Sequence, residues 1–417
     1  MSPHLPSRQS GGRVRLHGLA SRIAGSHSVS ILCFSHPDEA PLDPEKRGWF
    51  VDVVTVPLAA AGERAKRSLQ ARSLVSRRSF QRLRFDHRGF QRELDRLVAL
   101  RHFDLVQVEY AFLFGYRIPP GAAVVLDEHN IEYEIQRRTA EVATGPVRRL
   151  YNLIDHRKLR SHEERAWRTV DACAVTSARD ESTVRAASPE TPTAIVPNGV
   201  DSRYFTARSA IGDPDTILFF GTISYYPNTE GLVFFLREVF PLVKRARPNA
   251  RLVVVGDSPP AEIRRWAGPD VTITGAVDDV RPYLTRARVV IAPLRIGGGT
   301  RLKIVEAMAM GRPVVSTTLG AEGLAVTPGR EILLADDPAR FAGEVVHALS
   351  NDELATALGR DARAVAERAY DWSRSYEQLE RLYGVALSRR DARQREATAA
   401  SRPLRAEPDP NSSSATP

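Results

Sequence analysis

Short apolar runs alternate with longer amphipathic stretches along the chain, and this alternation predicts parallel β-sheets joined by crossover helices. The first half contains six runs with the length of buried strands, at 29–34, 51–56, 105–108, 124–127, 172–176 and 194–196. The second half contains six more, at 217–220, 252–256, 271–274, 289–292, 314–316 and 332–334. Two comparable sets in tandem predict an α/β fold of two doubly wound, Rossmann-like domains that face a cleft.

The domain boundary is readable because Pro197-Asn198-Gly199 follows the last strand of the first set and turns the chain. The prediction is therefore a first domain over 1–200 and a second domain over 201–366. Beyond Tyr383 the sequence becomes rich in arginine and then in Pro, Ser, Ala and Thr, without periodic apolar residues. We expect a disordered tail over 389–417.

The N-terminal segment departs from the pattern of a Rossmann-like half. Such a half opens with a buried strand, a glycine turn and a helix. Gly11-Gly12 and the helix-like run 14–23 are present, but residues 1–10 do not read as a strand. Either the first strand is missing or the chain starts downstream of the true start, and we favour the second interpretation.

Length and composition narrow the class of protein. The chain has 417 residues, 42% of them hydrophobic, and no run approaches the ~18–20 apolar residues of a membrane span. The first twenty residues lack the apolar core of an export signal. The two cysteines, Cys33 and Cys173, fall in predicted buried strands, as expected in a reducing compartment. We expect a cytoplasmic protein.

The formal charge of +9 is concentrated between residues 63 and 101, where twelve Lys and Arg residues stand against four Asp and Glu residues. Apolar residues are threaded between them. This composition is typical of a helix that lies on an anionic membrane surface or attracts a phosphorylated lipid. The alternative is a solvated helix face, and sparse aromatics argue against nucleic acid.

The most informative motif follows the strand at 289–292. Gly297, Gly298 and Gly299 precede Thr300, which we predict to cap a helix that Gly311 closes. Glycines let a backbone approach a ligand where the helix N-terminus offers unpaired N–H groups.

Three charged residues extend this motif. Arg301 and Lys303 place cations at the helix N-terminus, which the helix dipole disfavours unless an anion is bound. Glu306 lies one turn beyond Lys303, roughly 9 Å from the cap, within reach of the ribose hydroxyls of a nucleotide. We therefore predict a nucleotide-diphosphate site. The alternative is a flexible glycine turn with a solvated Glu306.

The ends of the first-domain strands supply the other side of the cleft. Asp127-Glu128-His129-Asn130 ends one strand, at the sheet edge where open α/β folds bind ligands. We predict a functional role for His129, with Asn130 beside it, although either could only cap the next helix. Glu109 ends the preceding strand and is a weaker candidate. Gly11, Gly12 and Arg15 are expected to line the cleft opposite the diphosphate.

One motif invites a wrong interpretation. Asp213-Pro214-Asp215 has the spacing of a metal-binding Asp-x-Asp motif, but it precedes a strand instead of ending one. We predict that it is a turn and that no metal or other cofactor is required.

Residues Gly297–Thr318 and Pro197–Asp201 resemble the donor-binding region of glycosyltransferase family 4, which has the GT-B fold and retains anomeric configuration. The sequence around Asp127–Asn130 and Gly221-Thr222 is similar to that of bacterial sugar transferases of exopolysaccharide synthesis. The resemblance covers about residues 11–383. It implies a C-terminal helix, 367–388, that crosses back to the first domain.

The resemblance also implies residue roles. Glu306 matches the glutamate that holds the donor ribose, and His129 matches the acceptor-domain histidine. The other matching positions are Gly299, Thr300 and Arg301 for the phosphates, Val277 for the base, and Gly221, Thr222 and Gly256-Asp257 for the nucleotide cleft.

Two departures qualify the resemblance. Gly298 stands where the family has its first glutamate, which touches the transferred sugar. The Arg and Lys that usually follow the first strand of the donor domain are also absent from 221–228. We infer that Arg301 and Lys303 instead supply the positive charges that contact the phosphates, and we predict that both act as catalytic residues.

The resulting hypothesis is a retaining, metal-independent transferase that moves a sugar from a nucleotide-diphosphate donor to a glycan or lipid-linked acceptor. Two alternatives stay open. One is a nucleotide-sugar epimerase on the same fold, and the other is a non-catalytic nucleotide- or glycan-binding protein.

Overall fold

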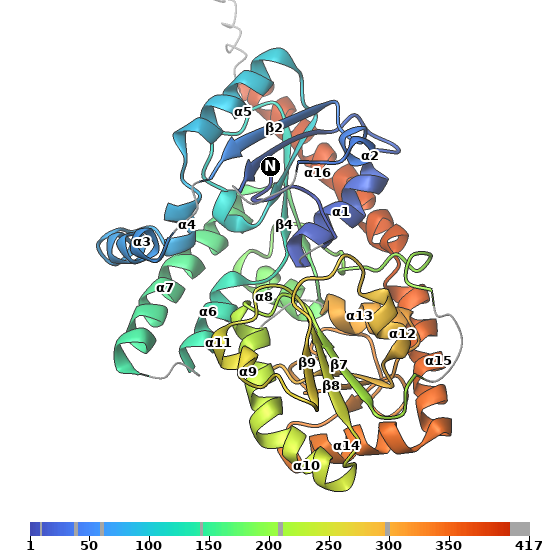
Figure 1. The fold of residues 1–417 in the computed structure, drawn as a ribbon. Helices are drawn as coiled ribbons and strands as arrows, with labels where there is room; N and C mark the ends of the chain where they lie inside the picture. The colour runs from blue at the N-terminus through green and yellow to red at the C-terminus, as the bar shows by residue number, and fades with distance from the viewer. Residues whose placement is uncertain are drawn as a thin grey trace, which may run out of the picture.

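The computed structural model describes residues 1–8, 11–36, 41–58, 62–141, 145–206, 212–296 and 301–400, which form two α/β domains stacked end to end (Figure 1). The side chains of residues 63, 399 and 400 are outside this description. The first domain contains the strands β1 (Ser30–Ser35), β2 (Asp52–Pro57), β3 (Leu105–Glu109), β4 (Ala123–Glu128), β5 (Ala172–Val175) and β6 (Thr193–Ile195). Its parallel sheets have the orders β1-β2 and β3-β4-β5-β6.

The second domain contains one parallel sheet in the order β12-β11-β10-β7-β8-β9. Its strands are β7 (Thr216–Phe220), β8 (Arg251–Val255), β9 (Val271–Ile273), β10 (Val289–Ala292), β11 (Val314–Ser316) and β12 (Leu333–Leu334). The order reverses between β10 and β7, which is the topological switch point of such a sheet. All twelve predicted strands are confirmed, and the fold class is that predicted.

Helices cover both faces of each sheet. The first domain has α1 (Gly11–Ile23), α2 (Pro44–Arg47), α3 (Glu63–Val75), α4 (Phe80–Arg84), α5 (Arg88–Leu100), the 3₁₀-helix η1 (Ala111–Leu113), α6 (Glu132–Glu141), α7 (Pro146–Thr169) and α8 (Ala178–Ala187). The second has α9 (Tyr226–Phe234), the π-helix η2 (Phe235–Val239), α10 (Phe240–Ala246), α11 (Ala261–Arg264), α12 (Arg281–Arg286), α13 (Leu302–Ala309), α14 (Pro338–Ser350) and α15 (Asp352–Ala369).

Burial on both faces explains why the strands were legible as continuous apolar runs. Every residue of β5, β10 and β11 is buried. One apolar cluster packs Phe235 and Phe341 against one face of the second sheet, and another packs Ile304 and Met308 against the other. Both cysteines are buried, and neither forms a disulfide within the described residues.

Residues 1 and 2 lie between the two sheets of the first domain. The amide of Ser2 donates to the carbonyl of Leu32 at 3.0 Å, and the amide of Glu109 donates to the carbonyl of Met1 at 2.9 Å. These bonds connect β1 to β3, so the first-domain strands form one continuous layer. The segment is therefore strand-like at its first two residues, and the favoured interpretation of the start stays a prediction.

Two chain crossings connect the domains and are paired with each other. The amide of Val200 donates to the carbonyl of Tyr370 at 2.6 Å, and the amide of Trp372 donates to that of Val200 at 3.3 Å. Ser202 Oγ adds a 2.6 Å bond to Asp371 Oδ2. These bonds hold the linker after β6 and the linker before the last helix together as one narrow hinge.

The C-terminal helix α16 (Trp372–Ala400) returns to the first domain and packs beside α1 and β4. It extends to Ala400, so the prediction of disorder from residue 389 is wrong for 389–400. Arginine side chains explain the extension, because Arg390 and Arg393 bond to Asp104 and Asp171 of the first domain. Residues 401–417 lie outside the described chain.

The basic segment 63–101 is three helices separated by turns. The last of them, α5, buries Phe90, Leu94 and Leu97 against the first-domain core. By contrast, α3 is exposed along most of its length and projects from the domain (Figure 1). Among the described residues, none of the helices combines the length and apolar content that a membrane crossing requires.

Trp372 should be the main anchor of α16, because its buried ring contacts Gly18 of α1 and Gly199 of the hinge. We predict that Trp372→Ala lowers the free energy of unfolding by about 3–5 kcal/mol, measured by urea titration. Val385→Ala, at an exposed position of the same helix, should change it by less than about 0.5 kcal/mol. A loss below 1 kcal/mol for Trp372→Ala would contradict this packing role.

Candidate functional site

The N-terminal ends of α1 and α13 face each other where the two domains meet. A methyl group added to Gly11 would lie 3.9 Å from Cδ1 of Leu302, the first residue of α13. Added to Gly12, it would lie 3.4 Å from Nδ1 of His129. The sequence-predicted Gly11, Gly12 and His129 are therefore brought together with the beginning of α13.

Helix α13 has the predicted end but begins one residue later than predicted. Arg301 occupies the N-cap position, so the assignment of the cap to Thr300 is wrong. Gly297–Thr300, which include the predicted Gly299, lie outside the described residues. Gly311 has φ +62° and donates to the carbonyl of Met308, which closes the helix as predicted.

Lys303 is held by a neighbour that the sequence did not single out. Its Nζ donates to Asn228 Oδ1 at 2.7 Å and lies 4.1 Å from the centroid of the Phe219 ring. Asn228 in turn donates to the carbonyl of Thr222 at 2.8 Å. Burial, with the nearby charge of Arg301, lowers the pKa of Lys303 to about 7. In the described chain, this ammonium has an amide partner but no carboxylate in a salt bridge.

Glu306 is half-buried one turn further along α13. Within the described part of the chain its carboxylate makes no hydrogen bond or salt bridge. Burial raises the pKa of Glu306 to about 8, although the charge of Lys303 acts in the opposite direction. A partly exposed carboxyl group with a raised pKa and no protein partner is characteristic of a ligand-binding position.

Glycines at the ends of β7 and β8 allow two loops to approach each other beside α13. Gly221 has φ +138° and Gly256 has φ +154°. A Cβ at Gly256 would lie 1.8 Å from the carbonyl oxygen of Gly221, so no side chain fits. Thr222 follows Gly221, and Val277, beyond β9, packs on the cluster beneath α13. The predicted Gly221, Thr222, Gly256 and Val277 thus follow the carboxyl ends of neighbouring strands of one sheet.

On the first-domain side, His129 is fixed by Glu109. Nε2 of His129 lies 2.5 Å from Oε2 of Glu109, and both side chains are buried. Burial raises the pKa of Glu109, but hydrogen bonds from His129 and Gln107 outweigh it and leave the pKa lowered. An ionised carboxylate only accepts, so Nε2 carries the proton. Glu109 therefore orients His129 from behind instead of lining the cleft.

Two tyrosines of the cleft were missed by sequence reasoning. The ring of Tyr110 packs against that of His129 with centroids 3.9 Å apart and planes tilted by 31°, and its backbone is left-handed with φ +67°. Such backbones are uncommon outside glycine and concentrate at functional sites. Tyr225, before α9, contributes to the electrostatic surroundings of Tyr110 and is itself influenced by Glu132 and Arg301. The feature that points to a functional role for Tyr110 is its strained backbone, and a sequence does not reveal backbone strain.

The prediction that Arg15 lines the cleft is wrong. It is completely buried and bonds both carboxylate oxygens of Asp127, at 2.9 and 2.6 Å, together with the carbonyl of Val196. It supports the motif Asp127–Asn130 from within the core and does not line the cleft. Asn130 is half-buried and bonds to Glu132.

Glu109, Asp127 and His129 have ligand atoms within 4.8 Å of one another, close enough to hold a metal ion. The donor set does not fit this use, because Arg15 neutralises Asp127 and Glu109 already accepts from His129 and Gln107. The Asp213-Pro214-Asp215 motif forms a turn before β7, where Asp215 pairs with Arg247 at 2.8 Å. It lies at the opposite sheet edge from the cleft.

The domains are also clamped on one flank of the cleft. Glu322, after β11, accepts from Arg138 of α6 at 2.9 and 3.3 Å and from Arg179 of α8 at 2.6 Å. Gly323 has φ +83°, and a Cβ there would lie 2.9 Å from Ser177 Cβ. The same loop lines a second-domain pocket of about 610 Å³ at the ends of β10 and β11.

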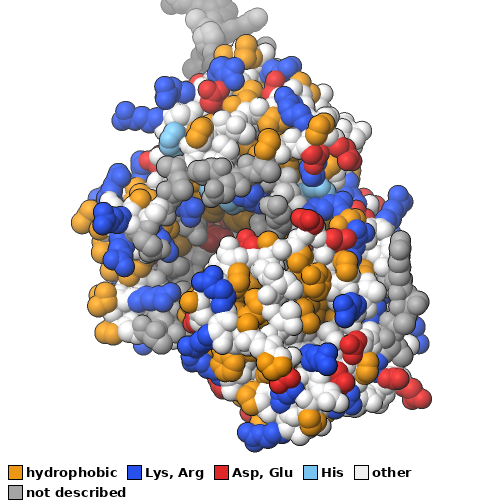
Figure 2. Space-filling view, in the orientation of Figure 1, with side chains coloured by type: hydrophobic (Ala, Val, Ile, Leu, Met, Phe, Trp, Pro, Cys, Tyr) orange, Lys and Arg blue, Asp and Glu red, His pale blue; other side chains and the backbone are white. Residues whose placement is uncertain are grey.

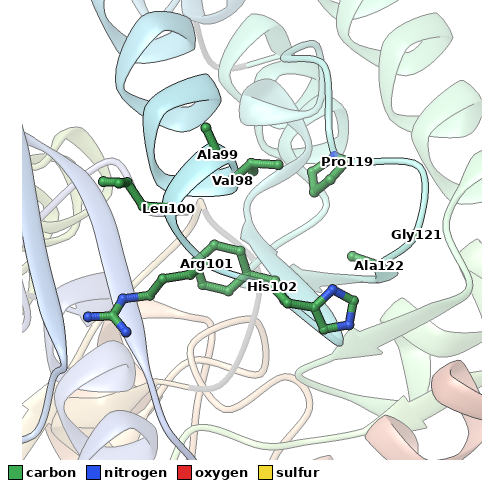
Figure 3. Close-up of a pocket in the computed structure, with 9 residues that line it drawn as sticks. Val98, Ala99, Leu100, Arg101, His102, Pro119, Gly121 and Ala122 are labelled. Carbon is green, nitrogen blue, oxygen red and sulfur yellow. The ribbon is translucent and has the colours of Figure 1, made fainter.

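A smaller pocket of about 330 Å³, shown in Figure 3, lies elsewhere. Val98, Leu100, Arg101 and His102 of the α5–β3 connection line it together with Pro119. It adjoins the amino ends of β3 and β4, so it is remote from His129 at the carboxyl end of β4. We exclude it from the candidate site.

Comparisons with known proteins agree with this geometry. Residues 214–351 match the family described as "Glycosyl transferases group 1". Over 199 residues, the chain is 32% identical to the phosphatidyl-myo-inositol mannosyltransferase of Mycobacterium leprae, covering 45% of this chain and 52% of that protein. The chain spans about half the length of the curated relatives that it matches.

Solved structures resemble almost the whole chain. Sucrose-phosphate synthase from Thermosynechococcus elongatus has a TM-score of 0.66 at 20% identity, covering 96% of this chain and 97% of that one. HepE of Anabaena, solved with UDP and glucose, has a TM-score of 0.62 at 14% identity, covering 90% and 97%. The match to the group 1 glycosyl transferases therefore covers the domain that carries α13, and the chain as a whole shares the GT-B architecture of these solved structures.

Proposed function

We propose that the chain transfers a sugar from a nucleotide-diphosphate donor to an acceptor bound by the first domain, with retention of configuration. The observation that carries the proposal is the beginning of α13, where Arg301 and Lys303 lie opposite Gly11 and His129. A cationic helix N-terminus in a partly buried position favours a bound anion. The family match over residues 214–351 supports the same assignment.

In this proposal the second domain binds the nucleotide. Lys303 and the amides at the start of α13 contact the diphosphate, and Asn228 keeps Lys303 beside Gly221. Glu306 accepts hydrogen bonds from the ribose hydroxyls, and its half-buried position one turn beyond Lys303 supports this role. HepE was solved with UDP, which makes a uridine nucleotide the first probe to test.

The difficult step is departure of the nucleoside diphosphate. Arg301, Lys303 and the oriented N–H groups of α13 stabilise the negative charge that develops on the leaving oxygen. His129, oriented by Glu109 and packed against Tyr110, contacts the transferred sugar from the first domain. The acceptor hydroxyl attacks on the face from which the phosphate leaves and gives its proton to that phosphate. This arrangement needs no metal and no covalent intermediate.

We infer a glycan or lipid-linked acceptor of the cell surface or of an exopolysaccharide. The mannosyltransferase relative is named for a phosphatidyl-myo-inositol acceptor, which supports the lipid-linked class. The cytoplasmic location expected from the sequence stays a prediction.

Glu306→Ala should weaken binding of UDP or GDP by about 1–3 kcal/mol, because it removes charge-assisted hydrogen bonds to the ribose. Calorimetric titration with both nucleotides measures this directly. Glu353→Ala, at an exposed position of α15, is the matched control and should leave the dissociation constant unchanged. An unaltered constant for Glu306→Ala would refute the ribose assignment.

The pH dependence of binding should separate the two charged groups. In a Glu306→Gln background, affinity for UDP-glucose should fall as the pH rises through the pKa of Lys303, because Lys303 must then take up a proton to meet the diphosphate; that pKa lies below about 7 once the Glu306 charge is removed. In a Lys303→Gln background, affinity should rise as Glu306 ionises, at a pH above about 8 because the lowering effect of the Lys303 charge is removed. The expected slopes approach tenfold per pH unit.

UDP-glucose is the suitable probe because neither of its phosphates titrates in this range. Flat profiles in both backgrounds would mean that neither group meets the ligand. Release of UDP only when an acceptor is present would separate transfer from epimerisation and from simple binding.

A further inference from the structure

The exposed hydrophobic side chains of the described chain are unevenly distributed. Five of the nine large ones lie on two helices: Leu74 (49% exposed), Val75 (90%), Val147 (82%), Leu150 (60%) and Leu153 (40%). Of the other four, Leu100 and Val385 lie on α5 and α16, and Val51 and Tyr225 lie just before β2 and α9. Single exposed apolar residues are ordinary, but a cluster marks an interaction surface.

The two helices form one continuous surface, which we call the α3–α7 surface and define as residues 64–75 and 146–157. Tyr151 Oη lies 3.0 Å from Ser73 Oγ, and Lys158 Nζ bonds to the carbonyl oxygens of Ser73 and Leu74. These bonds fix the end of α3 across α7. The exposed residues of both helices therefore share one flank of the first domain.

The same surface is basic. Its exposed cations are Arg64, Lys66, Arg67 and Arg72 on α3 and Arg148, Arg149 and Arg157 on α7. The one acidic residue within the defined ranges, Asp155, is buried and accepts from the amide of Phe80 at 2.9 Å. Figure 2 shows hydrophobic and basic side chains intermixed over the region that α3 and α7 occupy in Figure 1.

We propose that the α3–α7 surface docks the protein on an anionic lipid bilayer. Apolar side chains that enter the interface and cations that meet lipid phosphates are the two contributions that hold interfacial helices on such membranes. Nucleic acid explains the cations but gives Val75 and Val147 nothing to contact. A second copy of the chain would bring seven cations against seven of the same charge.

The position of the α3–α7 surface suggests why docking would help the enzyme reach a lipid-linked acceptor. This part of the inference rests on the proposed function. The Arg148 guanidinium lies 5.2 Å from the ring centroid of Tyr226, the first residue of α9 in the second domain. The docking surface therefore reaches the boundary between the domains. Helix α6, which packs on α7, begins directly after Asp127–Asn130. A lipid-linked acceptor in the bilayer would have only one helix layer between it and His129.

The test is flotation of the full chain with vesicles of phosphatidylcholine alone or with 30 mol% phosphatidylglycerol added, in the absence of nucleotide (about one lipid in three anionic, enough for a strong negative surface). We expect binding to the anionic vesicles and little to the neutral ones. Combined Val147→Ser, Leu150→Ser and Leu153→Ser substitutions should lower the partition coefficient about tenfold or more. Arg64→Glu, Lys66→Glu and Arg67→Glu, combined, should do the same.

The matched control carries Val51→Ser, Leu100→Ser and Val385→Ser, which remove exposed apolar residues elsewhere and should change partitioning less than about twofold. Circular dichroism checks that each variant folds. Equal binding to neutral and anionic vesicles, or unchanged binding of both α3–α7 variants, would overturn the proposal. So would a dimer in sedimentation that either variant dissolves, because the surface would then be a self-association interface.

The outcome is separable from that of the proposed function. Glu306→Ala should float with anionic vesicles as the unmodified chain does, because Glu306 lies outside the surface. Vesicle binding by a chain that binds no nucleotide would leave the docking inference standing and remove the transferase proposal.

Discussion

The site depends on positive charge placed where burial and the helix dipole both oppose it. Lys303 lies near the beginning of α13, has an amide and an aromatic ring as neighbours, and has its pKa lowered to about 7. One turn away, burial likewise disfavours the negative charge of Glu306 and raises its pKa to about 8. A bound nucleotide diphosphate would relieve both, because its phosphates favour the ammonium and its ribose hydroxyls favour the carboxylate. This opposition of charge and burial is the basis of the nucleotide site that we propose.

The rest of the fold keeps this charge facing the first domain. The hinge pairs Val200 with Tyr370 and Trp372, so the two linkers that join the domains lie side by side. On one flank, Glu322 binds Arg138 and Arg179 of the opposite domain. These charge-assisted bonds are strong in their partly buried setting, yet they break without exposing a hydrophobic core. They suit an interface that holds the cleft closed and still opens for substrate.

Much of this arrangement was accessible from the sequence. The twelve strands were legible because most are buried on both faces, and the beginning of α13 was marked by glycines, two cations and Glu306 at helical spacing. Predictions failed where a side chain's role depends on long-range packing. Arg15 lies one turn after Gly11 and Gly12 at the start of α1, but its guanidinium points inward to Asp127. Tyr110 and Asn228 carry no local signal, since their contacts with His129 and Lys303 come from distant elements. Helical structure over 389–400 arises from contacts with the first domain that composition does not disclose.

The most direct test of the central claim is a crystal structure of the chain with UDP or GDP bound. The account predicts that the β-phosphate lies within hydrogen-bond distance of Lys303 Nζ and the first amides of α13, and that both ribose hydroxyls meet the Glu306 carboxylate. A nucleotide bound instead in the pocket beside Thr317 and Asp336, with Glu306 left without a ligand contact, would contradict it.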